Sequence, residues 1–213
     1  MKRKILKVIT FCAFLFCGMS ASPQTPIYLD KSQPIEQRIE DALSRMTLQE
    51  KINIIHAQSK FSAPGVPRLG IPELWCTDGP MGVRPEVMWD EWDQAAWTND
   101  SCMAFPALSC LAATWNPRMA SLYGKSIGEE ARFRNKSVLL GPGINVYRTP
   151  LCGRNFEYMG EDPYLISHMV VPYVQGVQSN GVSACVKHFA LNNNEIEFFI
   201  VLLHRRLQPK NYL

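Results

Sequence analysis

Apolar residues recur along this chain at two spacings, one typical of amphipathic helices and one of short buried strands. Near the N-terminus, Ile35, Ile39, Leu43 and Met46 fall on one face of a predicted helix. The capping box Thr47-Leu48-Gln49-Glu50 predicts the start of a second helix directly after it.

Two longer helices are predicted further along, each beginning with a polar N-cap followed by proline, at Asn116-Pro117 and at Asp162-Pro163. Their apolar stripes are Met119, Tyr123, Ile127 and Ala131 in the first, and Val170, Val174 and Val177 in the second. Short apolar segments at 71–77, 138–140 and 182–186 predict strands between the helices. Alternating strands and helices indicate a parallel α/β fold.

Charged residues follow two of these strands at the point where the apolar run ends. Asp78-Gly79-Pro80 follows the first strand and Lys187-His188 follows the last, while Gly153–Pro163 forms a predicted loop that contains Arg154. Taken singly, these are a turn aspartate, a solvated strand end and a surface turn with ordinary ion pairs. Together they favour a shared site, because the carboxyl ends of barrel strands build the active face of a (β/α)8 barrel.

A longer ordered set of motifs extends this pattern. The motifs are Asp78-Gly79-Pro80, Gly82-Val83-Arg84, Ala104-Phe105-Pro106, Ala113-Thr114-Trp115-Asn116, Gly141-Pro142-Gly143-Ile144-Asn145, Gly153-Arg154-Asn155-Phe156-Glu157, Gly160-Glu161-Asp162-Pro163 and Lys187-His188-Phe189. In order and spacing the set resembles the N-terminal barrel of glycoside hydrolase family three, in its bacterial β-glucosidase branch. A complete barrel has about 250 residues, so the resemblance implies an α/β fold that is an incomplete (β/α)8 TIM-type barrel, its N-terminal half to two-thirds.

The resemblance also implies a substrate-binding site of four side chains. Asp78 matches an aspartate that binds hydroxyls of the sugar on the non-reducing side of the scissile bond, and Arg154 matches an arginine that holds a sugar hydroxyl. Lys187 and His188 match a lysine-histidine pair on the opposite side. Such side chains can satisfy vicinal hydroxyls without a metal or cofactor, because the hydroxyls both donate and accept.

The implied activity is that of an exo-acting β-glycosidase, a hydrolase of O-glycosyl bonds whose substrate is a β-linked glucoside or xyloside. Retaining glycosidases need two carboxyl groups about 5–5.5 Å apart. The family's nucleophile is an aspartate in a Ser-Asp-Trp-like context, and its acid/base usually comes from a following domain. This chain has no Ser-Asp-Trp and no aspartate after Asp162. We therefore assign no catalytic residue and expect the chain to be inactive alone. A non-catalytic sugar-binding half-barrel and an unstable fragment without function remain as alternatives.

Three segments divide the chain. Residues 1–22 predict a signal peptide, because four positive charges precede an apolar run and small residues follow it. This indicates a periplasmic or secreted protein without a membrane span. Residues 30–195 carry the partial barrel. Residues 196–213 match no family motif. Three interpretations remain: a short tail that binds a membrane surface or a partner, a strand with a solvated basic end, and out-of-frame translation or a truncated gene model, which we favour.

Charge and metal-binding patterns exclude two kinds of partner. Seven of the 22 basic residues lie in the two terminal segments, so the rest of the chain is mildly acidic and unsuited to nucleic acid. The four histidines are far apart, and no metal-ligand spacing occurs.

Cysteines and tryptophans leave two questions open. Cys76 and Cys185 lie on predicted strands and are expected to be buried, whereas Cys102 and Cys110 are a candidate disulfide pair. The segment Met88–Asn99 contains three tryptophans and predicts either an outer sugar subsite or a loop anchored by buried tryptophans.

Overall fold

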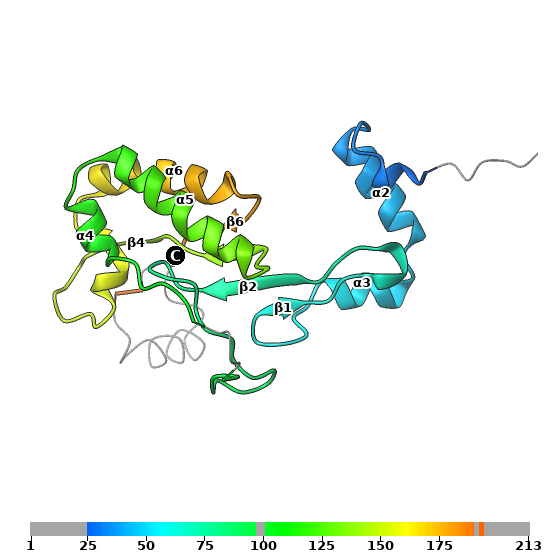
Figure 1. The fold of residues 1–213 in the computed structure, drawn as a ribbon, viewed down its shortest axis with the longest axis horizontal. Coiled ribbons are helices and arrows are strands. Elements are labelled where there is room, and N and C mark those ends of the chain that lie inside the picture. Colours follow the sequence, from blue (N-terminus) through cyan, green and yellow to red (C-terminus); the bar gives the residue numbers. More distant parts are fainter. Residues whose placement is uncertain (1–24, 97–100, 190–191, 194–213) are drawn as a thin grey trace, which may run out of the picture. The chain divides into compact units, whose positions relative to one another are not determined.

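The computed structural model describes residues 25–96, 101–189 and 192–193 (Figure 1). The predicted signal peptide (1–22) and tail (196–213) lie outside these residues. The chain divides into two units at Lys51 and Ile52, and each unit is described by itself.

The first unit contains a 3-10 turn, η1 (Ile27–Leu29), and helix α2 (Ile35–Arg45), followed by the start of α3 (Leu48–Ile54). The predicted capping box is confirmed: the Thr47 backbone N–H donates to Glu50 Oε2 at 2.8 Å, and the Glu50 N–H donates to Thr47 Oγ1 at 3.2 Å. These two bonds satisfy amide groups that have no partner within the helix.

The second unit is built on a sheet whose described strands have the order β1-β2-β3-β6. Strand β1 (Ser62–Ala63) is antiparallel to β2 (Leu74–Asp78), whereas β3 (Val138–Leu140) is parallel to both β2 and β6 (Ser183–Ala184). Because β2, β3 and β6 run in one direction, their carboxyl ends meet at one edge of the sheet.

A second parallel pair joins this sheet just beyond β6. Strand β4 (Gly143–Val146) pairs with β5 (Tyr158–Gly160), and a parallel bridge connects Gly143 to Lys187. Two backbone bonds hold this junction, from the Ile144 N–H to the Lys187 carbonyl (2.7 Å) and from the Lys187 N–H to the Pro142 carbonyl (3.0 Å). The segment that follows β6 is therefore fixed beside β4.

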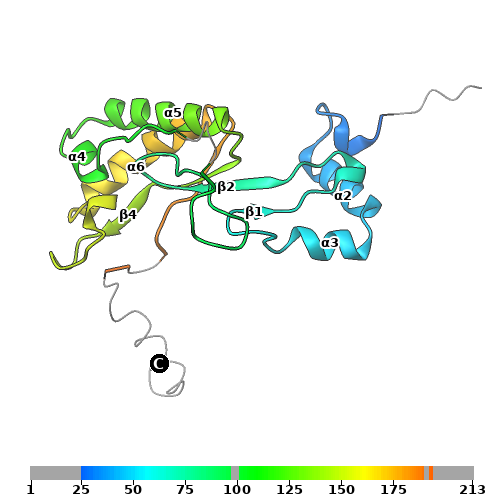
Figure 2. The same ribbon diagram turned by 60° about the horizontal axis from the view of Figure 1, so that its bottom comes forward.

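Helices α4 (Leu108–Ala112), α5 (Pro117–Phe133) and α6 (Pro163–Gln178) pack against β3, β4, β5 and β6 (Figure 2). The core between them includes Ile127, Leu139, Met169 and Tyr173. Helices α5 and α6 pack closely because α5 has glycine at position 124, where a Cβ atom would collide with the Tyr173 carbonyl oxygen. The parallel strands and covering helices confirm the predicted α/β class.

The predicted helix starts are confirmed as well. Asn116 Oδ1 accepts from the Arg118 N–H at 3.0 Å, and Asp162 Oδ1 accepts from the Tyr164 N–H at 2.9 Å. In the part of the chain that the structure describes, no helix is both long enough and apolar enough to cross a membrane.

Several local predictions are wrong. The predicted loop at 153–163 contains a 3-10 turn, η3 (Asn155–Glu157), and strand β5. The first predicted strand begins at Leu74 and not at Ile71. Cys185 is exposed and Cys76 is half-buried, although both were expected to be buried. The open question of a Cys102–Cys110 disulfide is answered as well, because the five described cysteines are all free.

Candidate functional site

Asp78 ends strand β2 and begins a tight turn. The Gly79 N–H donates to Asp78 Oδ1 at 3.0 Å, and the Arg84 N–H donates to the Asp78 carbonyl oxygen at 3.1 Å. Gly79 has φ 118°, and a Cβ atom there would collide with the Gly82 carbonyl oxygen. The Asp78-Gly79-Pro80 motif therefore needs glycine at its second position to present the carboxylate at the end of the strand.

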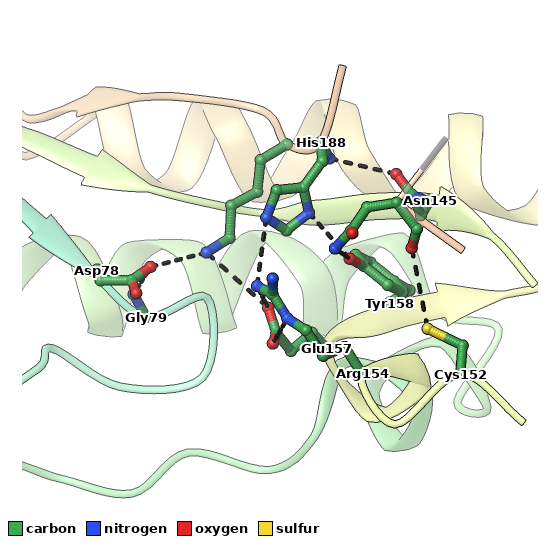
Figure 3. Close-up of polar contacts among 10 residues, drawn as sticks. Asp78, Gly79, Asn145, Cys152, Arg154, Glu157, Tyr158 and His188 are labelled. Atoms are coloured by element: carbon green, nitrogen blue, oxygen red, sulfur yellow. Dashed lines mark hydrogen bonds and ion pairs between the residues drawn. The ribbon is translucent and has the colours of Figure 1, made fainter. Parts of the chain in front are cut away.

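Lys187 and His188 follow β6 and are held by β4. Besides the two backbone bonds at Lys187, the His188 N–H donates to Asn145 Oδ1 at 3.3 Å. The Lys187–His188 peptide bond is cis. Held in this way, Lys187 reaches Asp78 at the end of β2, whereas the His188 ring lies beside Arg154 and Tyr158 (Figure 3).

Arg154 lies in the loop between β4 and β5 and makes a two-point ion pair with Glu157. Its Nε lies 2.5 Å from Glu157 Oε1, and its terminal nitrogen lies 2.8 Å from Oε2. The turn η3 brings the two residues together at a spacing of three positions. This geometry binds one edge of the guanidinium, through Nε and a terminal nitrogen, to both carboxylate oxygens and so fixes its orientation.

The four predicted residues converge on one site (Figure 3). Lys187 Nζ lies 2.7 Å from Asp78 Oδ1 and 3.9 Å from Glu157 Oε2. Arg154 donates to His188 Nε2 at 3.2 Å. Asp78, Arg154, Lys187 and His188 thus come from three separate chain segments and form one polar cluster.

The contacts of His188 define its protonation. A guanidinium cannot accept a hydrogen bond, so the Nε2 that faces Arg154 carries a lone pair. Nδ1 then carries the proton and donates to the Tyr158 hydroxyl, 2.9 Å away. Asn192 Nδ2 also donates to this hydroxyl at 2.7 Å.

Exposure differs across the cluster. The side chains of Asp78 and Arg154 are 37% and 31% exposed, whereas those of Lys187 and Glu157 are 14% and 11% exposed. Burial opposes ionisation of Asp78, but the hydrogen bond and charge of Lys187 outweigh it and hold the pKa of Asp78 below its ordinary value. Burial raises the pKa of Tyr158.

The structure adds three residues that were not predicted: Asn145, Glu157 and Tyr158. Glu157 has a sequence signal, because it follows Arg154 by three positions within the quoted motif. Asn145 and Tyr158 contact His188 although they are 43 and 30 residues away in the sequence, and no local sequence pattern predicts such contacts. Among the described residues, no group of three histidine, cysteine or carboxylate side chains could hold a metal ion.

Comparison with known proteins decides the family. The model of the glycosyl hydrolase family 3 N-terminal domain matches residues 54–194. The chain belongs to this family. Its fold is therefore an incomplete (β/α)8 TIM-type barrel, as predicted.

Individual relatives agree with the family assignment. The β-glucosidase BoGH3A of Bacteroides ovatus is 69% identical over 173 residues, which cover 81% of this chain and 23% of the relative. An exo-α-(1→6)-L-arabinopyranosidase of Bifidobacterium longum is 38% identical, with 71% and 20% covered. The solved structure of β-glucosidase 3B from Thermotoga neapolitana with glucose superposes with a TM-score of 0.64 at 38% identity, covering 74% of this chain and 24% of that one. The chain spans about a quarter of the length of these family members.

Proposed function

We propose that this chain is the sugar-binding part of an exo-acting β-glycosidase of the β-glucosidase type. Asp78, Arg154, Lys187 and His188 would hold the non-reducing terminal sugar of a β-linked glucoside or xyloside. The convergence of these four side chains carries the proposal. Carboxylate, ammonium, guanidinium and imidazole alternate there as acceptors and donors, which matches the paired hydroxyls of a pyranose.

The carboxylates of this cluster do not suit hydrolysis. A general acid must carry a proton, but Lys187 holds the pKa of Asp78 low and keeps its carboxylate ionised. Glu157 is nine-tenths buried and both of its carboxylate oxygens are bound by the Arg154 guanidinium, so it is not free to attack a sugar carbon. These pairings favour sugar binding without hydrolysis by this chain alone.

The relatives support a class of substrate and not one sugar. Their names describe a β-glucosidase in Bacteroides ovatus and an arabinopyranosidase in Bifidobacterium longum, and both match this chain over most of its length. We therefore propose a terminal pyranoside, with the glucoside and the xyloside as first probes. We also propose export to the periplasm or cell exterior, on the charge and apolar pattern of residues 1–22. The N-terminal mass of the mature product tests this export, since retained Met1 would contradict it.

The activity is tested with 4-nitrophenyl β-glucoside. The 213-residue chain should show no turnover above the uncatalysed background, whereas the chain continued after Asn194 with the remainder of the Bacteroides ovatus relative should hydrolyse it. Asp78→Ala in the continued chain should abolish turnover. Hydrolysis by the 213-residue chain that Asp78→Ala removes would contradict the proposal, because the chain would then contain a nucleophile that we have not identified.

A further inference from the structure

Two buried tyrosines of the helix pair α5 and α6 have their hydroxyl groups near the turn that carries Asp78. The Tyr173 hydroxyl on α6 donates to the Pro80 carbonyl oxygen at 3.0 Å, although the two residues are 93 positions apart in the sequence. The Tyr123 hydroxyl on α5 lies 2.7 Å from the Pro106 carbonyl oxygen and 3.4 Å from that of Pro80, so it donates mainly to Pro106. The direct hydrogen bond to the Pro80 carbonyl is therefore that of Tyr173.

The packing of α5 on α6 fixes the Tyr173 side chain. Tyr173 is fully buried, and its ring packs on the Tyr123 ring with centroids 5.5 Å apart. Its backbone faces Gly124, where a Cβ atom would collide with the Tyr173 carbonyl oxygen. Burial also raises the pKa of Tyr173 well above its ordinary value, so the hydroxyl keeps its proton and remains a donor at neutral pH. The helix pair thus presents a fixed hydrogen-bond donor to Pro80.

Pro80 lies in the turn that leaves strand β2 at Asp78. The turn is closed by the bond from the Arg84 N–H to the Asp78 carbonyl oxygen, 3.1 Å long. Within it, Gly79 and Gly82 have φ angles of 118° and 151°. Because glycine adopts positive and negative φ angles about equally readily, the residues of the turn do not select this conformation by themselves. The hydrogen bond at Pro80, which lies between the two glycines, is one of the outside contacts that select it.

The conformation of this turn affects the position of the Asp78 carboxylate. Asp78 Oδ1 accepts from the Gly79 N–H at 3.0 Å and from Lys187 Nζ at 2.7 Å. Pro80 follows Gly79 directly, so a shift of Pro80 moves the backbone that carries the Gly79 N–H. The Asp78 side chain is 37% exposed, so its orientation depends on these hydrogen bonds more than on packing around it. A contact at Pro80 is therefore linked to the pairing of Asp78 with Lys187.

We propose that Tyr173 is a positioning residue of the sugar site, which holds the Asp78 carboxylate against Lys187 through the Pro80 carbonyl. This inference rests on the function proposed above and extends the site into the helix pair α5 and α6. Tyr173 is assigned no contact with the sugar, because it acts through Asp78. Such a role predicts effects at Asp78 that a loss of core stability alone would not produce.

The test uses Tyr173→Phe in the 213-residue chain, which keeps the buried ring and removes the hydroxyl. Burial opposes ionisation of Asp78 and the bond to Lys187 outweighs it, so a weaker bond should raise the pKa of Asp78 toward its ordinary value of 3.8. An NMR titration of the Asp78 carboxyl carbon measures this change. Titration calorimetry should show the Kd for methyl β-glucoside raised about two- to tenfold, the size of one hydrogen bond.

Tyr123→Phe is the matched control. Tyr123 is buried in the same core, and its hydroxyl is bound mainly to Pro106. We expect this variant to lower the Tm, as Tyr173→Phe does, because each loses a buried hydrogen bond. The pKa of Asp78 and the Kd for methyl β-glucoside should not change in Tyr123→Phe. Both quantities are measured at a temperature where circular dichroism shows the variants to be folded.

The outcomes separate this inference from the proposed function. A lower Tm in Tyr173→Phe with an unchanged Asp78 pKa and Kd would overturn the positioning role, and so would equal changes in the two variants. A measurement on the unsubstituted chain needs no variant: the Cζ resonance of Tyr173, but not that of Tyr123, should shift with the midpoint of the Asp78 titration, and the absence of this shift would refute the link. If the unsubstituted chain does not bind methyl β-glucoside, the proposed function fails, whereas the Asp78 pKa in Tyr173→Phe still decides whether Tyr173 positions Asp78.

Discussion

Replacing Lys187 with methionine removes the ammonium group that Asp78 and Glu157 share and retains a side chain of similar length. The Lys187 nitrogen lies 2.7 Å from Asp78 Oδ1 and 3.9 Å from Glu157 Oε2. In the variant, burial would still oppose ionisation of Asp78, but the main interaction that offsets it would be lost. We therefore expect the pKa of Asp78 to rise and the affinity for methyl β-glucoside to be lost.

The structure also bounds the effect on stability. A hydrogen bond between charged groups contributes about 1.5–3 kcal/mol to folding. The Asp78 side chain is 37% exposed, so water screens part of this interaction. We expect Lys187→Met to lower the free energy of unfolding at neutral pH by about 1–2 kcal/mol, less than the loss of a fully buried ion pair.

The pH dependence gives a second, independent signature. Because the folded pKa of Asp78 is below its ordinary value of 3.8, its contribution to stability is present above that value and is lost as the pH falls through the folded pKa. Raising the folded pKa reduces the difference between the two states. The acid decline in the free energy of unfolding should therefore be shallower in Lys187→Met.

Urea unfolding from neutral to acidic pH, together with an NMR titration of the Asp78 carboxyl carbon, measures both effects. Lys125→Met is the matched control, because Lys125 is an exposed lysine on α5. An unchanged Asp78 pKa in Lys187→Met would refute the reasoning, since it would show that the ammonium does not hold the carboxylate in its ionised form.

Two further predictions concern the helices that support the site. Gly124→Ala should gain about 1 kcal/mol of helix propensity but lose more, about 1–3 kcal/mol, because its Cβ would collide with the Tyr173 carbonyl and force α5 from α6. Thermal unfolding should show a lower Tm, with exposed Gln175→Ala as control, and an unchanged Tm would contradict the close packing. Asp162→Ala should destabilise the chain by about 1 kcal/mol through loss of the 2.9 Å N-cap bond, as measured by denaturant unfolding. Asp162→Asn should retain most of that stability, and an equal loss in both variants would contradict the capping role.

The predictions that were confirmed rest mostly on local physics. The N-caps at Asn116 and Asp162 and the capping box at Thr47 involve groups within three positions of one another, so the sequence specifies them directly. The contact of Asp78 with Lys187 spans 109 positions. It could still be anticipated, because each residue follows a strand and parallel strands bring their carboxyl ends to one edge.

The features that were missed depend on pairing between distant segments. Strand β5 has three residues and no alternation of apolar and polar positions, so only its pairing with β4 identifies it. Strand β3 lies between β2 and β6, so the strands that precede Asp78 and Lys187 in the sheet are not hydrogen-bonded to each other. Strand order in a sheet follows from how helices pack across it, and that information is not local in the sequence.

The ion pairs in the site indicate that its carboxylates bind the sugar and do not carry out hydrolysis. Asp78 is bound to Lys187, and Glu157 is bound to Arg154 with the Lys187 nitrogen 3.9 Å away, so each carboxylate of the cluster is paired with a cation. Such pairs fix the orientation of carboxylate oxygens and of the donors beside them, which suits ground-state binding of sugar hydroxyls. Hydrolysis also needs a carboxyl group that can carry a proton and another that is free to attack. Lys187 lowers the pKa of Asp78, so Asp78 does not suit the role of proton donor. Both oxygens of Glu157 are bound by Arg154, so Glu157 is not free to attack. We therefore expect the two catalytic carboxyl groups to come from segments other than the described cluster.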